Sequence, residues 1–287
     1  GLFQACEAGD STKVAEFLKQ GGRANYFDDI KGGTTPVHAA CTLPKDAAAL
    51  EALIAFAATE PGDDLKPLFD LPSTVLKATP LHCAAEVGNS AQLEVLLKLG
   101  VDANGENAYG DTPLLVACAN NQAECVKLLL DHGADPTKAN HKKQNALHMA
   151  VAGLGKALRS EEGKENDSPS LIEAQLLVAK RLLANPKVAL AKRIDPNHAD
   201  ANGQTPLHFA CCHQCDPRVA KLLIDRYPEA CGVQDRDGNA PLHFALIRSA
   251  HPAVVQLLVK THPLACAMRG FLGRLPLSLA LLYEAHP

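Results

Sequence analysis

The sequence lacks a long apolar run and an excess of basic residues. Hydrophobic residues make up 47% of the 287-residue chain, but no run approaches the roughly 18–20 apolar residues of a membrane-spanning helix. Acidic side chains outnumber basic ones, 32 against 28, and the net charge of −4 argues against a dedicated nucleic-acid binder. The first three residues do not resemble a signal peptide, and the missing initial Met suggests a processed chain or part of a longer one.

The sequence also lacks the short motifs of common catalytic sites. Neither H-E-x-x-H nor G-x-S-x-G occurs. The stretch from Gly105 to Thr112 has the spacing of a phosphate-binding loop, but Asp111 stands where that loop requires lysine. No segment places a nucleophile beside a base, so we expect no enzyme activity, no cofactor and no small-molecule substrate.

An internal repeat dominates what is present. Residues 79–82 read Thr-Pro-Leu-His, and the pattern restarts at Thr112 and Asn145, two steps of 33 residues. Further restarts begin at Thr35, Thr205, Ala240 and Leu275. Residues 2–10 match 81–89 without the leading turn, and the last unit stops after its first helix. A period of this length predicts a solenoid of about eight two-helix units, the first and last incomplete.

Two segments interrupt the period. The step from Thr35 to Thr79 is 44 residues, which places an insert near 60–77, where we expect a loop with room for one helical turn. The second helix of that unit is expected at 47–58. The step from Asn145 to Thr205 is 60 residues, so the helices at 146–159 and 171–183 are separated by a second insert near 155–170. Its polar and acidic part, 160–170, indicates a mobile loop.

These residues resemble the ankyrin repeat family over nearly the whole chain, apart from the two inserts. The resemblance implies one all-α domain over 1–287, with an antiparallel helix pair per unit and connecting loops or β-hairpins. Thr can cap a helix start and Pro suits the first helical position. Turn glycines that suit a positive φ precede the units, at Gly33, Gly110, Gly203, Gly238 and Gly273. Departures are Leu115 and Ser278 in place of His, and Lys77 and Lys143 in place of Gly, and these weaken individual turns.

The repeated histidines invite a metal or catalytic interpretation. They occur once per unit, at His38, His82, His148, His208 and His243. Neighbouring copies should therefore lie about 8–10 Å apart, too far to share one ion whose bonds to His are about 2 Å. The resemblance implies instead that this His hydrogen-bonds locally and ties neighbouring turns together.

The ten cysteines follow the repeat rather than a disulfide pattern. One register position holds Cys6, Cys41, Cys118 and Cys211, and another holds Cys231 and Cys266. We interpret them as small buried apolar residues in a reducing compartment, hence a cytoplasmic or nuclear protein.

A cysteine cluster and a basic stretch remain as weaker candidates. Cys212 and Cys215 form a C-x-x-C with His213 between them, but no second pair follows for zinc. Exposed, reactive thiols fit this cluster, centred on Cys211, Cys212 and Cys215, better than a metal site. The basic stretch is Lys180, Arg181, Lys187, Lys192 and Arg193, which is more typical of a solvated helix face than of a phosphate or acidic-peptide site.

We therefore expect a non-catalytic module that binds a protein or peptide through its concave face. The resemblance places contacts at the turn tips Tyr109, Asp111, His141, Lys142, Asn202, Gln204, Arg236, Asp237, Asn239, Phe271, Leu272 and Arg274. It also places them at the ends of first helices, at Glu86, Cys212, His213, Ile247, Arg248, Leu282 and Tyr283. In the last unit, Phe271 and Leu272 could instead pack under further chain. The alternatives are a regulatory or targeting domain of a larger enzyme or channel and, less well supported, a metal- or redox-sensing cysteine cluster.

Overall fold

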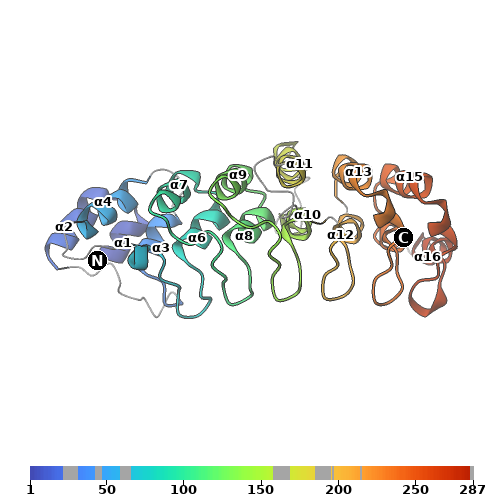
Figure 1. Cartoon of the computed structure of the whole chain (residues 1–287), viewed down its shortest axis with the longest axis horizontal. Helices are drawn as coiled ribbons and strands as arrows, with labels where there is room; N and C mark the ends of the chain where they lie inside the picture. The colour runs from blue at the N-terminus through green and yellow to red at the C-terminus, as the bar shows by residue number, and fades with distance from the viewer. Residues whose placement is uncertain are drawn as a thin grey trace. The chain divides into compact units, whose positions relative to one another are not determined.

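The computed structural model describes residues 1–21, 32–42, 47–58, 66–157, 169–184, 195, 197–213 and 215–284. The chain divides into two compact units, Gly1–Asp135 and Pro136–Pro287. Within each unit short helices follow one another in pairs, and the described residues form helices and turns without a β-sheet (Figure 1). The predicted all-α fold is confirmed, whereas the single-domain organisation over 1–287 stays a prediction.

The first unit contains four helix pairs among its described residues. The pairs are α1 (Leu2–Glu7) with α2 (Ser11–Lys19), α3 (Pro36–Cys41) with α4 (Ala48–Ala57), α6 (Pro80–Val87) with α7 (Ser90–Lys98), and α8 (Pro113–Ala119) with α9 (Ala123–Asp131). A single helical turn, α5 (Lys66–Phe69), precedes the third pair. Each pair begins where a repeat restarts in the sequence.

The second unit contains three pairs and one further first helix among its described residues. They are α10 (Ala146–Ala157) with α11 (Pro169–Ala184), α12 (Pro206–Cys212) with α13 (Pro217–Arg226), α14 (Pro241–Ile247) with α15 (Pro252–Thr261), and α16 (Pro276–Glu284). Short 3₁₀ helices are η3 (Pro228–Gly232), η4 (Pro263–Ala267) and η5 (Phe271–Gly273). Among the helices described, none has the length and apolarity needed to cross a membrane.

The repeated sequence sets where a first helix starts and ends. Thr112 is extended at the start of α8, its hydroxyl accepts the N–H of Leu115 at 3.4 Å, and Pro113 takes the first helical position. At the other end of such a helix, Gly88 adopts φ 83° and stops α6. The chain then reverses into α7, and the side chain of Asn89 donates to the carbonyl of Cys41 at 2.8 Å. This bond ties the reversal to the preceding pair.

The core of each unit lies between successive pairs. In the first unit α6 packs on α8 and α7 packs on α9. Leu81 and Leu114 are at most 1% exposed between the first helices, as are Leu96 and Leu129 between the second helices. Burying a leucine contributes about 1.5–3 kcal/mol, and the neighbouring pair supplies part of the cover of these side chains. The stack, rather than a single pair, is therefore the stable structure.

The first insert is more structured than a loop. The helix expected at 47–58 is α4, and the helical turn allowed for within 60–77 is α5. Its last residue, Phe69, is fully buried, which the sequence did not indicate. Residues 59–65 lie outside the described part of the chain.

The second insert joins the helices expected around it. Helix α10 is described to Ala157, and α11 begins at Pro169, two residues earlier than expected. Pro169 and Ser170 therefore belong to the helix rather than to the predicted loop, because proline suits the first turn of a helix. The rest of that loop, and Lys187, Lys192 and Arg193 of the basic stretch, lie outside the described residues.

The cysteine prediction holds for one register position and fails at one residue. The four cysteines that share the first position, Cys6, Cys41, Cys118 and Cys211, are all fully buried, and all ten thiols are free. Cys231 is also buried, but its counterpart Cys266 is exposed. Cys231 lies in η3, and η4 packs on η3. Among the described elements, no further 3₁₀ helix packs on η4 in the corresponding way. The expectation that Cys266 is buried was therefore wrong.

Candidate functional site

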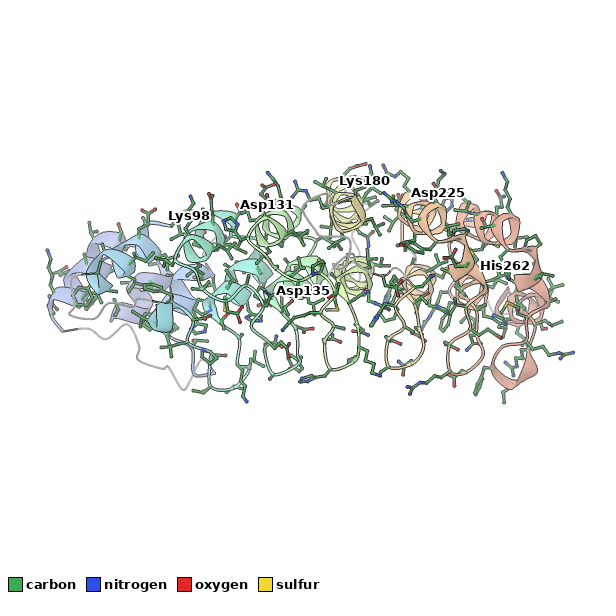
Figure 2. The ribbon with its side chains drawn as sticks, in the orientation of Figure 1. Lys98, Asp131, Asp135, Lys180, Asp225 and His262 are labelled. Atoms are coloured by element: carbon green, nitrogen blue, oxygen red, sulfur yellow. The ribbon has the colours of Figure 1, made fainter. Side chains whose placement is uncertain are left out.

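Five turns between successive repeats share one hydrogen-bonded shape. Figure 2 shows the turns of the second unit on the side opposite its second helices. In each of the five turns, the N–H of the first residue donates to the carbonyl of the fifth at 2.8–3.0 Å. The turns span 107–111, 140–144, 200–204, 235–239 and 270–274. In the first four the leading residue is Asn or Asp, and its Oδ1 accepts the N–H groups of the third and fifth residues. Hydrogen bonds within each turn therefore hold its tip in place.

The fourth residue of each turn has a positive φ, as the glycine pattern predicted. The values are 75° at Gly110, 80° at Gly203 and Gly238, and 70° at Gly273. Lys143 takes the same conformation with φ 59°, at a steric cost that glycine avoids. The departure from Gly at this position therefore leaves the shape of the turn intact.

Backbone hydrogen bonds also join neighbouring tips. In the second unit the N–H of Ala201 donates to the carbonyl of Lys142 at 2.8 Å, and that of Arg236 donates to Asn202 at 2.9 Å. In the first unit the N–H of Ala108 donates to Leu76 at 2.8 Å. Each of these bonds therefore fixes the position of one tip relative to its neighbour. Within a unit, the tips and the side chains on them form a connected row.

The repeated histidines form the second connection between successive repeats. In the first unit Nε2 of His82 donates to the carbonyl of Asp111 at 2.9 Å, and Nδ1 accepts the N–H of Thr79 at 3.1 Å. His38, His148 and His208 make the same Nε2 bond to the next turn, at 2.8, 2.9 and 3.1 Å. The structural role implied for the repeated histidines is confirmed for these four, whereas Nε2 of His243 has no such partner.

The structure places the predicted tip residues in two groups. Nine side chains are exposed, namely Tyr109, His141, Lys142, Asn202, Arg236, Asp237, Phe271, Leu272 and Arg274. The other three help to build the turns. Asn239 is only 8% exposed, Gln204 Nε2 donates to Asp235 Oδ2 at 3.2 Å, and the carbonyl of Asp111 accepts from His82.

The exposed charges on the tips of the second unit are mostly positive. Lys142, Lys143, Arg236 and Arg274 are exposed, against one exposed carboxylate, Asp237. The leading aspartates, such as Asp200 and Asp235, are buried because they accept the turn N–H groups. Sequence reasoning missed Lys143 as a surface residue, since it was assessed only as a substitute for the turn glycine.

The last tip departs from the repeated geometry. Gly270 stands where the other turns have Asn or Asp, and the N–H of Phe271 donates to Oδ1 of Asn239 at 3.0 Å. Leu272 has φ 57°, a conformation unusual for a bulky residue, and is 72% exposed. The backbone of Arg274 lies near His243, but Nε2 of this buried ring makes no hydrogen bond. The last tip thus exposes apolar side chains on a turn that is less well bonded than the others.

The predicted helix-end residues lie away from the tips. Cys212, His213 and Ile247 are half-buried, while Glu86, Arg248 and Leu282 are exposed. The side chain of Tyr283 lies outside the described part. A first helix of seven residues, such as α12, is about 10 Å long, and this length separates its end from the tip before it. The predicted tip residues and the predicted helix-end residues therefore lie at opposite ends of the first helices.

Comparison with known proteins identifies the repeat. A family model described as ankyrin repeats (3 copies) matches residues 2–107, 49–140, 81–160 and 172–282, which together cover most of the chain. The chain belongs to the ankyrin repeat family. Ankyrin repeats are protein–protein interaction modules, and the family is generally non-catalytic.

Several curated ankyrin repeat proteins are similar to this chain. Ankyrin repeat and SOCS box protein 16 of Homo sapiens is 30% identical over 246 residues, which cover 79% of this chain and 50% of that protein. SH3 and multiple ankyrin repeat domains protein 2 of Homo sapiens is 27% identical over 229 residues, 68% and 12% of the two chains. Transient receptor potential cation channel subfamily A member 1 of Drosophila melanogaster is 28% identical over 210 residues, 73% and 15%. The chain spans half the length, or less, of these relatives.

The cysteine cluster at the end of α12 does not have the environment of a reactive site. Cys211 and Cys215 are buried in the ankyrin stack, and burial raises the pKa of the Cys215 thiol to about 12. A buried thiol that resists ionisation is a poor nucleophile, so the expectation of exposed, reactive thiols in this cluster was wrong at Cys215, while Cys211 is buried as its register position predicted. Among the described residues, no three His, Cys, Asp or Glu side chains are gathered as metal ligands.

Proposed function

We propose that this ankyrin repeat chain is a non-catalytic module that binds a protein or peptide partner through the tip surface of its second unit. We define the tip surface as Lys142, Asn202, Arg236, Asp237, Phe271, Leu272 and Arg274. The observation that supports this is the connected row of tips: backbone bonds join the first three, and the N–H of Phe271 joins the last through Oδ1 of Asn239. A preorganised surface loses little conformational entropy when it binds.

The composition of the tip surface favours an acidic partner with an apolar residue. Lys142, Arg236 and Arg274 are exposed on three of the four tips of the second unit, and Phe271, 55% exposed, lies on the same tip as Arg274. Arginine and aromatic residues dominate the energetics of protein interfaces, while exposed charges steer association. The chain as a whole is slightly acidic, so this positive surface is local.

A pull-down with matched surface variants tests this proposal. The tip variant carries Lys142→Glu, Arg236→Glu and Phe271→Glu. The control variant carries Lys180→Glu, Lys260→Glu and Leu177→Glu, the same change of charge and apolarity on the second helices, where Figure 2 shows Lys180 on the side opposite the tips. All forms are confirmed folded by circular dichroism and used to recover proteins for mass spectrometry.

The proposal expects the same proteins with the parent and the control variant, and their loss with the tip variant. Because charge steers the contact, recovery should also fall as NaCl is raised from about 0.1 to about 0.5 M. Proteins retained equally by the tip variant would contradict a partner site on this surface.

A second candidate function is a regulatory or targeting part of a larger protein. The observation that favours it is the short span of the chain along its relatives, 50% of one and 15% of the channel subunit. The full-length transcript tests this candidate. Coding sequence for a catalytic or channel domain in the same reading frame would support it, whereas a stop codon directly after Pro287 and a start codon directly before Gly1 would contradict it.

We further propose a location in the cytoplasm or nucleus. The ten free thiols support a reducing compartment, because an oxidising one favours disulfides. Microscopy of a fluorescent fusion tests this, and accumulation in the secretory pathway would contradict it.

A further inference from the structure

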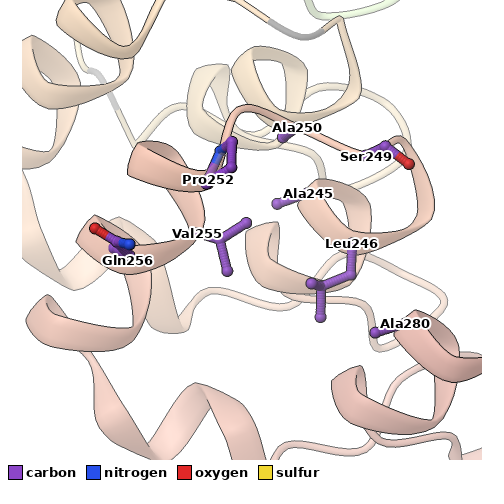
Figure 3. A pocket seen from close by; sticks show the side chains of 8 residues that line it. All are labelled: Ala245, Leu246, Ser249, Ala250, Pro252, Val255, Gln256 and Ala280. Carbon is purple, nitrogen blue, oxygen red and sulfur yellow. The ribbon is translucent and has the colours of Figure 1, made fainter. Parts of the chain in front are cut away.

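An open groove lies at the last helices of the second unit, away from the tips. Helices α15 and α16 both pack on α14, and the groove between them has a volume of about 500 Å³. Six of its eight lining residues are apolar, and two, Ser249 and Gln256, are polar. Leu246 of α14, Val255 of α15 and Ala280 of α16 line it from three helices (Figure 3).

In the preceding repeat, the space that corresponds to this groove is filled by a helix. Helices α13 and α14 both pack on α12, and α15 packs on both α13 and α14. The first unit repeats this arrangement, because α7 and α8 pack on α6, and α9 packs on α7 and α8. In both cases the occupant is a second helix of nine or ten residues. No described helix occupies the corresponding position against α15 and α16.

Residues of α16 can be compared with their counterparts 35 or 70 positions earlier, and the comparison shows that α16 is less covered. Leu277 is 68% exposed, whereas its counterpart Leu242, 35 residues earlier, is 1% exposed. Leu281 is 63% exposed, whereas Leu246, 35 residues earlier, is half-buried in the groove wall, and Cys211, 70 residues earlier, is fully buried. Leu277 and Leu281 lie one turn apart on α16, the helix whose Ala280 lines the groove. Because the earlier copies are covered more fully, the exposure of these two leucines continues an interface already present between earlier repeats.

We infer that this groove, with Leu277 and Leu281 beside it, binds a single amphipathic helix of about ten residues that packs on α15 and α16 as α15 packs on α13 and α14. The occupant presents an apolar face with side chains spaced like Val254 and Leu258, the buried residues of α15. Helix α15 contains one charged residue, Lys260, so the contact is apolar rather than ionic. This helix-docking groove is separate from the tip surface and does not depend on it.

A peptide taken from this chain provides the probe. Residues 250–262 contain α15 and are synthesised with blocked ends, and a control peptide carries Val254→Glu and Leu258→Glu. Methyl NMR of the 287-residue chain, labelled at Leu and Val, follows the titration. We expect shifts at Val255, Leu277 and Leu281 with a Kd on the order of 0.1–1 mM, since a short peptide must also form its helix.

Matched variants assign the binding to the groove. Val255→Glu and Leu281→Glu should each weaken binding about tenfold or more, because a charge would face the apolar helix. Leu177→Glu, which changes an exposed leucine of α11, should bind like the parent. Binding should persist at about 0.5 M NaCl, and the tip variant should bind the peptide normally, so failure of the tip proposal is distinguishable from failure of this one.

Three results would overturn the inference. The first is the absence of methyl shifts at Val255, Leu277 and Leu281 at about 2 mM peptide. The second is equal binding of the control peptide or of the groove variants. The third is a dimer, seen by sedimentation and abolished by Leu281→Glu, because a second copy of the chain would then cover this face in place of a single helix.

Discussion

Acidification from pH 7 to pH 5 should destabilise this fold through its buried histidines. The pKa of all five repeat histidines is lowered, in each case mainly by burial, which disfavours the charged ring. For His148, which is fully buried in the second unit, the pKa falls to about 4.

The hydrogen bonds of His148 explain why the neutral ring is the native form. Nε2 faces the carbonyl of Gln204 at 2.9 Å, which can only accept, so the single proton of the neutral ring lies there. Nδ1 then accepts the backbone N–H of Asn145 at 3.3 Å. The amide oxygen of Asn145 lies 2.7 Å from Nδ1 and could accept a second proton, but burial outweighs this and the pKa is lowered.

The sign of the effect follows from the two pKa values. In the unfolded chain His148 titrates near 6.5, above its folded pKa of about 4, so between these values the unfolded state binds more protons. The contribution to the free energy of unfolding is complete above about pH 6.5 and is lost as the pH falls toward 4. At pH 5 the loss from His148 alone is about 2 kcal/mol, and the other four histidines act in the same direction.

Urea unfolding at pH 7, 6 and 5, followed by circular dichroism, measures this loss. His148→Gln removes the titrating group, so its free energy of unfolding should fall by about 2 kcal/mol less than that of the parent between pH 7 and pH 5. Leu147→Ala also removes a fully buried side chain but none that titrates, and it should fall as much as the parent. Equal pH dependence in the parent and His148→Gln would refute the reasoning.

Three further predictions concern stability and thiol chemistry. Phe69→Ala should lower the free energy of unfolding by about 3–5 kcal/mol in urea titrations, because Phe69 is fully buried and leaves a cavity; a loss below about 1 kcal/mol would contradict this. Gly203→Ala should cost more than Gly133→Ala in the same assay, since both have positive φ, but only at Gly203 would a Cβ lie 3.0 Å from the backbone of the next tip; equal costs would contradict the close contact. Iodoacetamide, followed by peptide mass spectrometry, should modify exposed Cys266 in the native protein well before Cys118, whose pKa is raised by burial; similar rates would be the contrary result.

The periodic part of this fold was predictable because local and tertiary signals coincide in it. Thr and Pro at the start of α8 favour a helix start whatever surrounds them, and the leucines that follow are buried only if another pair stacks on them. A residue such as Gly203 then has a positive φ for a reason that the sequence itself carries. The position of a residue within one repeat therefore predicted the conformation of its counterpart in the next repeat.

The departures were not predictable because they depend on contacts outside the period. Phe69 lies in an insert, where no neighbouring copy shows that an aromatic side chain will be buried. Cys266 shares a register position with Cys231, yet it is exposed, because no further 3₁₀ helix among the described elements packs on η4 as η4 packs on η3. The positive φ of Leu272 breaks the preference of its residue type. In each case tertiary context decided the outcome.

The candidate site was predictable in position but not in exposure. Register placed Asn239 and Arg236 on the same tip, but the structure buries Asn239, whose amide oxygen accepts a hydrogen bond from the next turn. Lys143 shows the reverse case, since a residue considered only for its backbone contributes an exposed positive charge. Side-chain direction within a turn is set by its hydrogen bonds, which a repeat pattern does not specify.

The basic tips and the apolar groove of the second unit offer different kinds of contact. Each repeat leaves an apolar face that the next repeat covers, and on α16 Leu277 and Leu281 are exposed. Basic tips such as Arg236 offer charge that mainly speeds association, whereas the groove offers apolar area that slows dissociation. We therefore expect charge reversal on the tips to change association rates and salt dependence, and substitutions such as Val255→Glu to change dissociation rates.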